Sequence, residues 1–241
     1  MFKVGIIGGA GRMGSWFARL LVSKGYNVEI YDKDEEKSKE LALSLNIKVH
    51  EDLKSLVKEN DIIMISVPIE VTPEVIKEVR QILIKDHVRD KIVFDITTFK
   101  NDIIDLYKTF PKTSKVASTH PLFGPKAKAI NKHTVIITPI PGREEDSLIV
   151  SDFFQKLGFK VKTVDFRVHD KIVTLTIGLS YAIGVSLASL VASLNTELIE
   201  ELMGTTFRYL SIHYKSIILS LIHISEPTRP RLISYAVFCL K

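Results

Sequence analysis

Cysteine is almost missing from this chain of 241 residues: the only one, Cys239, lies near the C-terminal end. A chain with one thiol cannot close an internal disulfide, and residues 1–238 offer no cysteine ligand to a metal. The histidines His50, His87, His133 and His213 do not follow a metal-ligand spacing either. We therefore expect neither a disulfide framework nor a metal site.

Strong charge of one sign is missing as well. The formal net charge is +5, and two of these charges come from Arg229, Arg231 and Lys241 set against Glu226 near the C-terminal end. The remainder is too weakly basic to indicate a nucleic-acid partner. It favours a small anionic molecule as the ligand.

We also expect no secretory signal, because Met1 leads directly into the apolar run FKVGIIG. We expect a cytoplasmic protein. One long uncharged run, from Ile172 to Leu194, is long enough for a transmembrane helix. Its Thr, Ser and Gly content and Tyr181 favour a helix buried inside a soluble oligomer, so we expect no membrane partner.

The last 23 residues read as a tail of non-natural origin. LSLIHISEPTR (Leu219–Arg229) and ISYAVFCLK (Ile233–Lys241) look like the translated halves of a sequencing adapter, with an index between them. We expect residues 219–241 to lie outside the fold and the natural gene to continue beyond residue 218.

Apolar strand-like runs alternate with amphipathic helical segments over residues 1–165. Asp34 is suited to cap a helix, and Thr72 before Pro73 is typical of an N-cap followed by a first-turn proline. The alternation with short connections predicts an α/β domain, a doubly wound parallel sheet covered on both faces. From residue 166 to 218 only helical spacing remains, which predicts a second, all-helical domain.

A glycine motif, Gly9-x-Gly11-x-x-Gly14, follows the first predicted strand and opens a helix. In this context it indicates dinucleotide binding: we expect Gly9 to make the tight turn, Gly11 to let backbone approach the pyrophosphate, and Gly14 to let helix and strand pack closely. The helix N-terminus then offers N–H groups to the phosphates.

Asp32 ends the second predicted strand, where a carboxylate accepts hydrogen bonds from an adenosine ribose and repels a 2′-phosphate. This favours NAD over NADP, although Lys33 or Arg12 could reach a phosphate. The alternative is that Asp32 caps a helix or lies in a solvated turn. Ser66, Val67 and Pro68 end another strand at the same edge, either against the cofactor or as a simple strand stop.

STHPLFGPK, residues 118–126, places His120 at the carboxyl end of a further predicted strand. Ligands of open α/β sheets bind along that edge. Pro121 restricts His120 to extended geometry, and a neutral imidazole can take a hydroxyl proton as hydride leaves the same carbon. The alternative is that His120 satisfies a buried carbonyl.

The combination GGAGRMG, SVP, DITTFK and THPLFGP, at this spacing, resembles the prephenate dehydrogenase family over residues 1–215, and its short archaeal-type members most. The resemblance implies a Rossmann domain followed by a helical domain that forms a homodimer. It implies NAD as cofactor, held by the predicted cofactor-binding residues Gly9, Gly11, Arg12, Met13, Gly14, Asp32, Ser66, Val67 and Pro68.

The resemblance also implies roles for single residues. His120 matches the family's catalytic histidine, and Thr98 in DITTFK matches a serine that contacts the same substrate hydroxyl. Lys100 belongs to the same motif, with a structural or electrostatic role. Tyr181 stands where the family often has a substrate-facing histidine, and Arg208 is a candidate for the substrate carboxylate. The pair His169-Asp170 matches an HD pair at the start of the first long helix.

The implied activity is the NAD-dependent oxidative decarboxylation of prephenate to 4-hydroxyphenylpyruvate, a step of tyrosine biosynthesis. Three alternatives stay open. The substrate could be arogenate, or either compound, as in a cyclohexadienyl dehydrogenase. The chain could belong to another oxidoreductase class, such as coenzyme F420-dependent NADP reductases, which lack HPLFGP. Finally, the chain could bind NAD(P) without catalysing a reaction.

Overall fold

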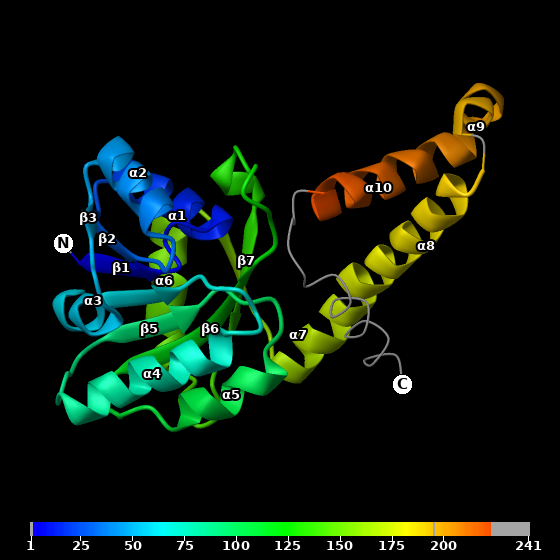
Figure 1. Ribbon diagram of the computed structural model, residues 1–241. Helices are drawn as coiled ribbons and strands as arrows, with labels where there is room; N and C mark the ends of the chain where they lie inside the picture. The colour runs from blue at the N-terminus through cyan, green and yellow to red at the C-terminus, as the bar shows by residue number, and fades with distance from the viewer. Residues whose placement is uncertain (1, 195, 223–241) are drawn as a thin grey trace. The chain divides into compact units, whose positions relative to one another are not determined.

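The computed structural model of the protein describes residues 2–194 and 196–222. The chain divides into two compact units between Asp170 and Lys171. The fold class predicted from the sequence, an α/β Rossmann-type sheet followed by helices, is confirmed (Figure 1).

The first unit is built on one eight-stranded sheet with the order β3-β2-β1-β4-β5-β6-β7-β8. The strands are β1 (Lys3–Ile7), β2 (Asn27–Tyr31), β3 (Lys48–Val49), β4 (Ile62–Ile65), β5 (Ile92–Asp95), β6 (Lys115–Pro121), β7 (Thr134–Thr138) and β8 (Lys160–Thr163). The first six follow the strand order of a dinucleotide-binding sheet. One pairing departs from the predicted parallel sheet, because β6 and β7 run antiparallel, with His120 opposite Ile136.

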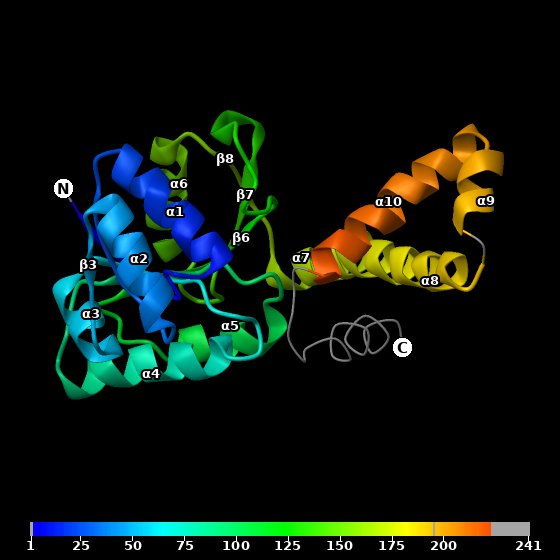
Figure 2. The same cartoon turned by 45° about the horizontal axis from the view of Figure 1, so that its top comes forward.

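Helices cover both faces of this sheet (Figures 1 and 2). They are α1 (Arg12–Ser23), α2 (Glu35–Leu45), α3 (Leu53–Glu59), α4 (Thr72–Lys85), α5 (Asn101–Lys108) and α6 (Asp146–Leu157), with a 3₁₀ turn at Ile130–Lys132. One core cluster joins the sheet to α1, α2 and α6, and a second joins it to α3, α4 and α5. Successive strand residues such as Ile6 and Ile7 therefore contribute to opposite clusters, which is why the strands read as continuous apolar runs.

The helix caps follow the sequence at some ends and not at others. Asp34 caps α2 by accepting a hydrogen bond from the backbone N–H of Lys37 at 3.1 Å, as predicted. The sequence suggested Thr72 as the N-cap of α4, but Thr72 does not have this position in the structure. Its hydroxyl instead donates to the carbonyl of Pro68 at 3.0 Å, because a turn beginning at Pro68 already starts the helix.

The second unit contains helices only. After α7 (Phe166–Val173), which spans the division, a π-helical segment (Thr174–Leu179) leads into α8 (Ser180–Ala192). The short helix α9 (Thr196–Leu202) and then α10 (Thr205–Ile222) follow, and α10 packs along α8 (Figure 2). Residues 219–222 of the predicted tail continue α10, and the rest of that tail, with Cys239, lies outside the described residues.

Within the described residues, one continuous helix, Phe166–Ala192, is long and apolar enough to cross a membrane by length and composition. Core helices of soluble proteins reach the same length and apolar composition. The absence of a membrane partner stays a prediction.

Candidate functional site

The glycine loop between β1 and α1 is tightly packed. The motif suggested a tight turn at Gly9. Gly8 instead has the positive φ, of 78°, so the tight turn lies at Gly8. A Cβ on Gly9 would lie 2.6 Å from Cβ of Ile30, and one on Gly14 would lie 2.1 Å from the carbonyl oxygen of Gly8. Gly9 thus brings the loop against β2, and Gly14 brings α1 against the loop.

The N-terminus of α1 is open toward this loop. Gly11 is the N-cap, and no side chain of the described residues caps the helix or places an acid in its first turn. Arg12, which is exposed, and Met13, which is half-buried, are the first helical residues. Backbone N–H groups and the positive end of the helix dipole are therefore available to an anion.

A cavity of about 600 Å³ lies beside the glycine loop. Five of the predicted cofactor-binding residues line it, together with side chains that the motif did not single out. The predicted ones are Gly11, Asp32, Ser66, Val67 and Pro68, and the additional ones include Ala10, Tyr31, Lys37, Leu53, Val71 and Val75. The other predicted residues, Gly9, Arg12, Met13 and Gly14, shape the loop and the helix start without lining the cavity.

Asp32 connects the end of β2 to the glycine loop. Its Oδ2 accepts a hydrogen bond from the N–H of Ala10 at 2.9 Å, and its Oδ1 accepts one from the N–H of Asp34 at 3.1 Å. Part of the alternative role, a carboxylate satisfying a local turn, is therefore present. Each carboxylate oxygen has a second lone pair, so Asp32 can still accept hydrogen bonds from ribose hydroxyls on the cavity side.

We expect Gly14→Ala to disrupt this loop. The new methyl would lie 2.1 Å from a backbone oxygen that cannot rotate away, so α1 must shift from β1. We expect a destabilisation of about 1–3 kcal/mol in urea unfolding followed by Trp16 fluorescence, and a loss of dinucleotide binding. Gly204→Ala is the control, since nothing lies within 4 Å of its Cβ position. Equal effects of both variants would contradict this account.

A buried charge network lies at the end of β5, in the segment Asp95–Lys100. Lys100 is fully buried, and its Nζ donates to Oδ1 of Asp95 at 3.2 Å and to the carbonyl of Thr119 at 2.6 Å. The carboxylate of Asp95 also accepts from the N–H of Thr97. Burial lowers the pKa of Lys100, while Asp95 and Asp170 act in the opposite direction. The network ties the segment carrying Thr98 to β6 at Thr119, the residue directly before His120.

Thr98 itself is half-buried, and its hydroxyl has no hydrogen-bond partner among the described residues. Thr98 comes shortly after Asp95, the last residue of β5. Asp95 pairs with Ser118 of β6, and His120 comes two residues after Ser118. Both side chains therefore belong to the same edge of the sheet as the glycine loop.

His120 is buried at the end of β6, with 5% of its surface exposed. Its Nδ1 lies 3.0 Å from Nε2 of His169, whose Nδ1 lies 2.8 Å from Oδ1 of Asp170. Burial, then the charge of Lys100 and the neighbouring His169, lower the pKa of His120 to about 3. The imidazole is therefore neutral at pH 7 and able to accept a proton.

The loop that follows His120 is anchored on α1. Phe123 stacks on Phe159 with ring centroids 5.4 Å apart and also contacts Trp16. The indole N–H of Trp16 donates to the carbonyl of Ala127 at 3.1 Å. The HPLFGP segment is thereby held against the helix that begins at the glycine loop.

The lowered pKa of His120 predicts an acid-sensitive contribution to stability. The unfolded imidazole titrates near 6.5 and the folded one near 3, so the unfolded state binds more protons between these values. The contribution is complete above pH 6.5 and decreases by about 1.4 kcal/mol per pH unit below it. Unfolding free energies of wild type and His120→Asn, measured by urea titration from pH 7 to 4, should therefore converge as pH falls. Parallel curves would contradict the shift.

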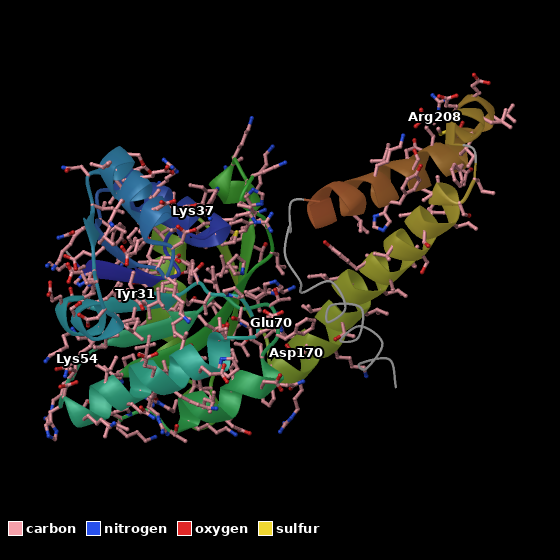
Figure 3. All side chains as sticks on the ribbon, in the orientation of Figure 1. Tyr31, Lys37, Lys54, Glu70, Asp170 and Arg208 are labelled. Carbon is pink, nitrogen blue, oxygen red and sulfur yellow. The ribbon has the colours of Figure 1, made fainter. Side chains whose placement is uncertain are left out.

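Of the predicted substrate residues, Tyr181 and Arg208 belong to the second unit. Tyr181 is half-buried on α8. Arg208 is exposed on α10, where Figure 3 labels it. Their contact with a substrate stays a prediction. The structure adds His169 and Asp170 to the surroundings of His120. In the sequence, only the HD pair itself signalled them.

One group of potential metal ligands is present among the described residues: Glu29, His50 and Glu59, whose ligand atoms lie within 4.8 Å of one another. Protein partners already occupy them. His50 lies between Glu29 and Ser55, and Glu59 pairs with Lys48. We assign no metal to this group.

Comparison with known proteins identifies the family of the chain. Residues 17–163 match the family model described as prephenate dehydrogenase, nucleotide-binding domain. A probable arogenate/prephenate dehydrogenase of Methanocaldococcus jannaschii is 33% identical over 201 residues, which cover 82% of this chain and 44% of that protein. A cyclohexadienyl dehydrogenase of Zymomonas mobilis is 26% identical over 206 residues, or 80% of this chain and 68% of that protein. The chain thus spans less than half the length of the Methanocaldococcus relative.

Solved structures show the same fold. A prephenate dehydrogenase from Aquifex aeolicus, in complex with hydroxyphenyl propionate and NAD⁺, superposes with a TM-score of 0.71 at 22% identity, over 98% of this chain and 86% of that one. An arogenate dehydrogenase from Synechocystis gives a TM-score of 0.72 at 18% identity, over 99% and 85%. The family match begins within α1, after the glycine loop, and covers the sheet from β2 to β8. The chain belongs to the prephenate dehydrogenase family through its nucleotide-binding domain.

Proposed function

We propose that the protein catalyses the NAD-dependent oxidative decarboxylation of prephenate to 4-hydroxyphenylpyruvate, with His120 as the general base. The observation that carries this proposal is the neutral, buried imidazole at the edge of the sheet that also holds the glycine loop. The family match and the relatives named for prephenate and arogenate support it.

The residues present fit a dinucleotide. Gly9 leaves no room for a side chain against Ile30 of β2, and the uncapped start of α1 suits the pyrophosphate. Asp32 lies in the cavity wall, where its charge favours a ribose hydroxyl over a 2′-phosphate. Lys37 lines the same cavity, but its Nζ is already paired with Asp34 at 2.5 Å. These features favour NAD over NADP.

The chemistry then needs one base and one hydride acceptor. NAD, when bound, accepts the hydride from C4 of the ring. His120 takes the proton of the C4 hydroxyl, and we assign to the half-buried Thr98 the role of holding that hydroxyl by a hydrogen bond. The ring carboxylate leaves as carbon dioxide, its electron pair enters the ring, and the ring becomes aromatic. Tyr181 and Arg208 are proposed to contact the rest of the substrate.

Arogenate is the second candidate substrate, because two of the related proteins carry arogenate or cyclohexadienyl in their names. It differs from prephenate by an amino group in place of the side-chain keto group. The ring chemistry at His120 is the same for both.

The activity is tested by following NADH formation at 340 nm with the full-length protein. Prephenate and arogenate are each assayed with NAD and with NADP. We expect turnover with prephenate and NAD, and a lower kcat/KM with NADP. Turnover with arogenate alone would reassign the substrate, and absence of turnover with either compound, together with intact NAD binding, would support an inactive binding protein.

We also propose a cytoplasmic homodimer assembled through the helical unit. Large apolar side chains of that unit are exposed to solvent in the single chain, among them Leu175, Leu190, Leu202 and Tyr209. An apolar surface of this extent is typical of a protein–protein interface. Light scattering of the full-length protein after size exclusion should give twice the mass of one chain, and a monomer at micromolar concentration would contradict the proposal.

A further inference from the structure

Three buried side chains form a chain of hydrogen bonds behind the proposed base. Asp170 Oδ1 lies 2.8 Å from Nδ1 of His169, and His169 Nε2 lies 3.0 Å from Nδ1 of His120. None of the three residues is more than 5% exposed. The two imidazole rings stand nearly perpendicular, at 83°, so each nitrogen meets its partner without stacking.

The direction of these hydrogen bonds is set at Asp170. Its Oδ2 accepts from the backbone N–H groups of Lys100 and Asn101, both at 2.9 Å, and its Oδ1 also lies 3.1 Å from the N–H of Lys100. A carboxylate whose two oxygens both receive N–H groups acts as a hydrogen-bond acceptor. The contact with Nδ1 of His169 must therefore be a donation from the imidazole to Asp170.

The direction of the other hydrogen bond, between His169 and His120, follows from the chemistry of imidazole. A neutral ring that donates through Nδ1 accepts through Nε2, so His169 must accept from Nδ1–H of His120. His120 then carries its proton on Nδ1 and has its lone pair on Nε2, which has no partner among the described residues. This is the nitrogen that is free to take a proton from a substrate.

Asp170 has a second connection to the site. The N–H groups of Lys100 and Asn101 belong to the start of α5, directly after the segment that carries Thr98. The same carboxylate therefore fixes the tautomer of His120 and holds the end of the Thr98 segment. Figure 3 labels Asp170 at the first turns of α7.

We propose that His169 and Asp170 are positioning residues that hold His120 in the Nδ1–H tautomer, with Nε2 as the acceptor of the substrate hydroxyl proton. Their catalytic effect rests on the proposed function, whereas the tautomer itself does not. When His120 takes a proton on Nε2, its Nδ1–H keeps the same acceptor, Nε2 of His169, so no further proton transfer is needed.

The variant Asp170→Asn tests the proposal, because an amide can donate to Nδ1 of His169 and so reverse both hydrogen bonds. His120 would then carry its proton on Nε2 and be unable to act as a base. We expect kcat to decrease by about 100-fold or more, with the KM for NAD within about 2-fold of wild type. Asp105→Asn, an exposed acid of α5 paired only with Lys108, is the control and should keep full activity.

The variant His169→Gln tests the middle residue of the three hydrogen-bonded side chains. The amide oxygen of Gln can accept from Nδ1–H of His120, so we expect this variant to keep the tautomer and to lose less than about 10-fold in kcat. If His169 and Asp170 served only in packing, the loss of kcat would not be larger in Asp170→Asn than in His169→Gln. Equal losses in Asp170→Asn and His169→Gln would count against the proposal.

The tautomer is read directly by long-range ¹H–¹⁵N NMR of histidine-labelled protein at pH 7, with His120 assigned from the signal lost in His120→Asn. We expect Nδ1–H in wild type and Nε2–H in Asp170→Asn. If Asp170→Asn fails to fold, the wild-type spectrum and His169→Gln decide. An active enzyme with Nε2–H at His120 would overturn this inference alone, whereas an inactive protein with Nδ1–H would remove the proposed function alone.

Discussion

Replacing His120 with asparagine is expected to lower kcat by about 10²–10⁴-fold, the range lost when a positioned general base is removed. The amide can still donate to His169, but it has no lone pair basic enough to take the hydroxyl proton. Dinucleotide binding should stay within about 2-fold of wild type, since His120 does not line the cavity beside the glycine loop. Steady-state kinetics with prephenate and NAD titrations measure the two effects separately.

His87→Asn is the matched control for that substitution. His87 is exposed, lies after α4, and has a positive φ of 52°, a backbone conformation that asparagine adopts readily. We expect unchanged kcat and unchanged stability. Full turnover by His120→Asn would remove His120 from the mechanism, whereas a similar loss in His87→Asn would indicate general damage to the protein.

The second large effect is expected at Lys100. Lys100→Met removes the ammonium that lies between Asp95 and the carbonyl of Thr119, all of them buried. The carboxylate of Asp95 is then left in the interior without its counter-charge, which costs about 3–5 kcal/mol when one partner of a buried pair is deleted. Urea unfolding followed by Trp16 fluorescence should show this loss, because Trp16 is the single tryptophan and lies in the first unit.

A surface lysine provides the comparison. Lys108 on α5 pairs with Asp105, whose side chain is 83% exposed, and Lys108→Met should change stability by less than about 1 kcal/mol. Combining Lys100→Met with Asp95→Leu removes both buried charges, and we expect the double variant to be less destabilised than the sum of the single variants. Strict additivity would mean that the two charges do not depend on each other.

Several local features could be predicted because their cause lies in adjacent residues. Asp34 caps α2, and Gly14 is the site where α1 meets the loop, as the motif indicated. In both cases the contacts that decide the conformation join residues that are close in the sequence. The turn itself was assigned to the wrong glycine. Two neighbouring glycines can both adopt a positive φ, and packing of Gly9 against Ile30 leaves that conformation to Gly8.

Other features depend on partners that are far away in the sequence. The segment Thr134–Thr138 has the apolar pattern of any buried strand, and this pattern does not encode direction. Only the path of the connection after Pro121 makes β7 antiparallel to β6. Thr72 was expected to cap α4, but a turn beginning at Pro68 and the hydroxyl of Thr97 determine its hydrogen bonds.

By itself, the sequence determined the alternating α/β architecture, the glycine loop and the histidine at a strand end, because hydrophobic periodicity and turn chemistry act between neighbouring residues. Only the tertiary structure decided which nitrogen of that histidine is free. His120 and His169 are 49 residues apart in the chain, and their hydrogen bond exists because the sheet brings the end of β6 to the start of α7. Direction and polarity of hydrogen bonds depend on three-dimensional proximity, which local sequence patterns do not specify.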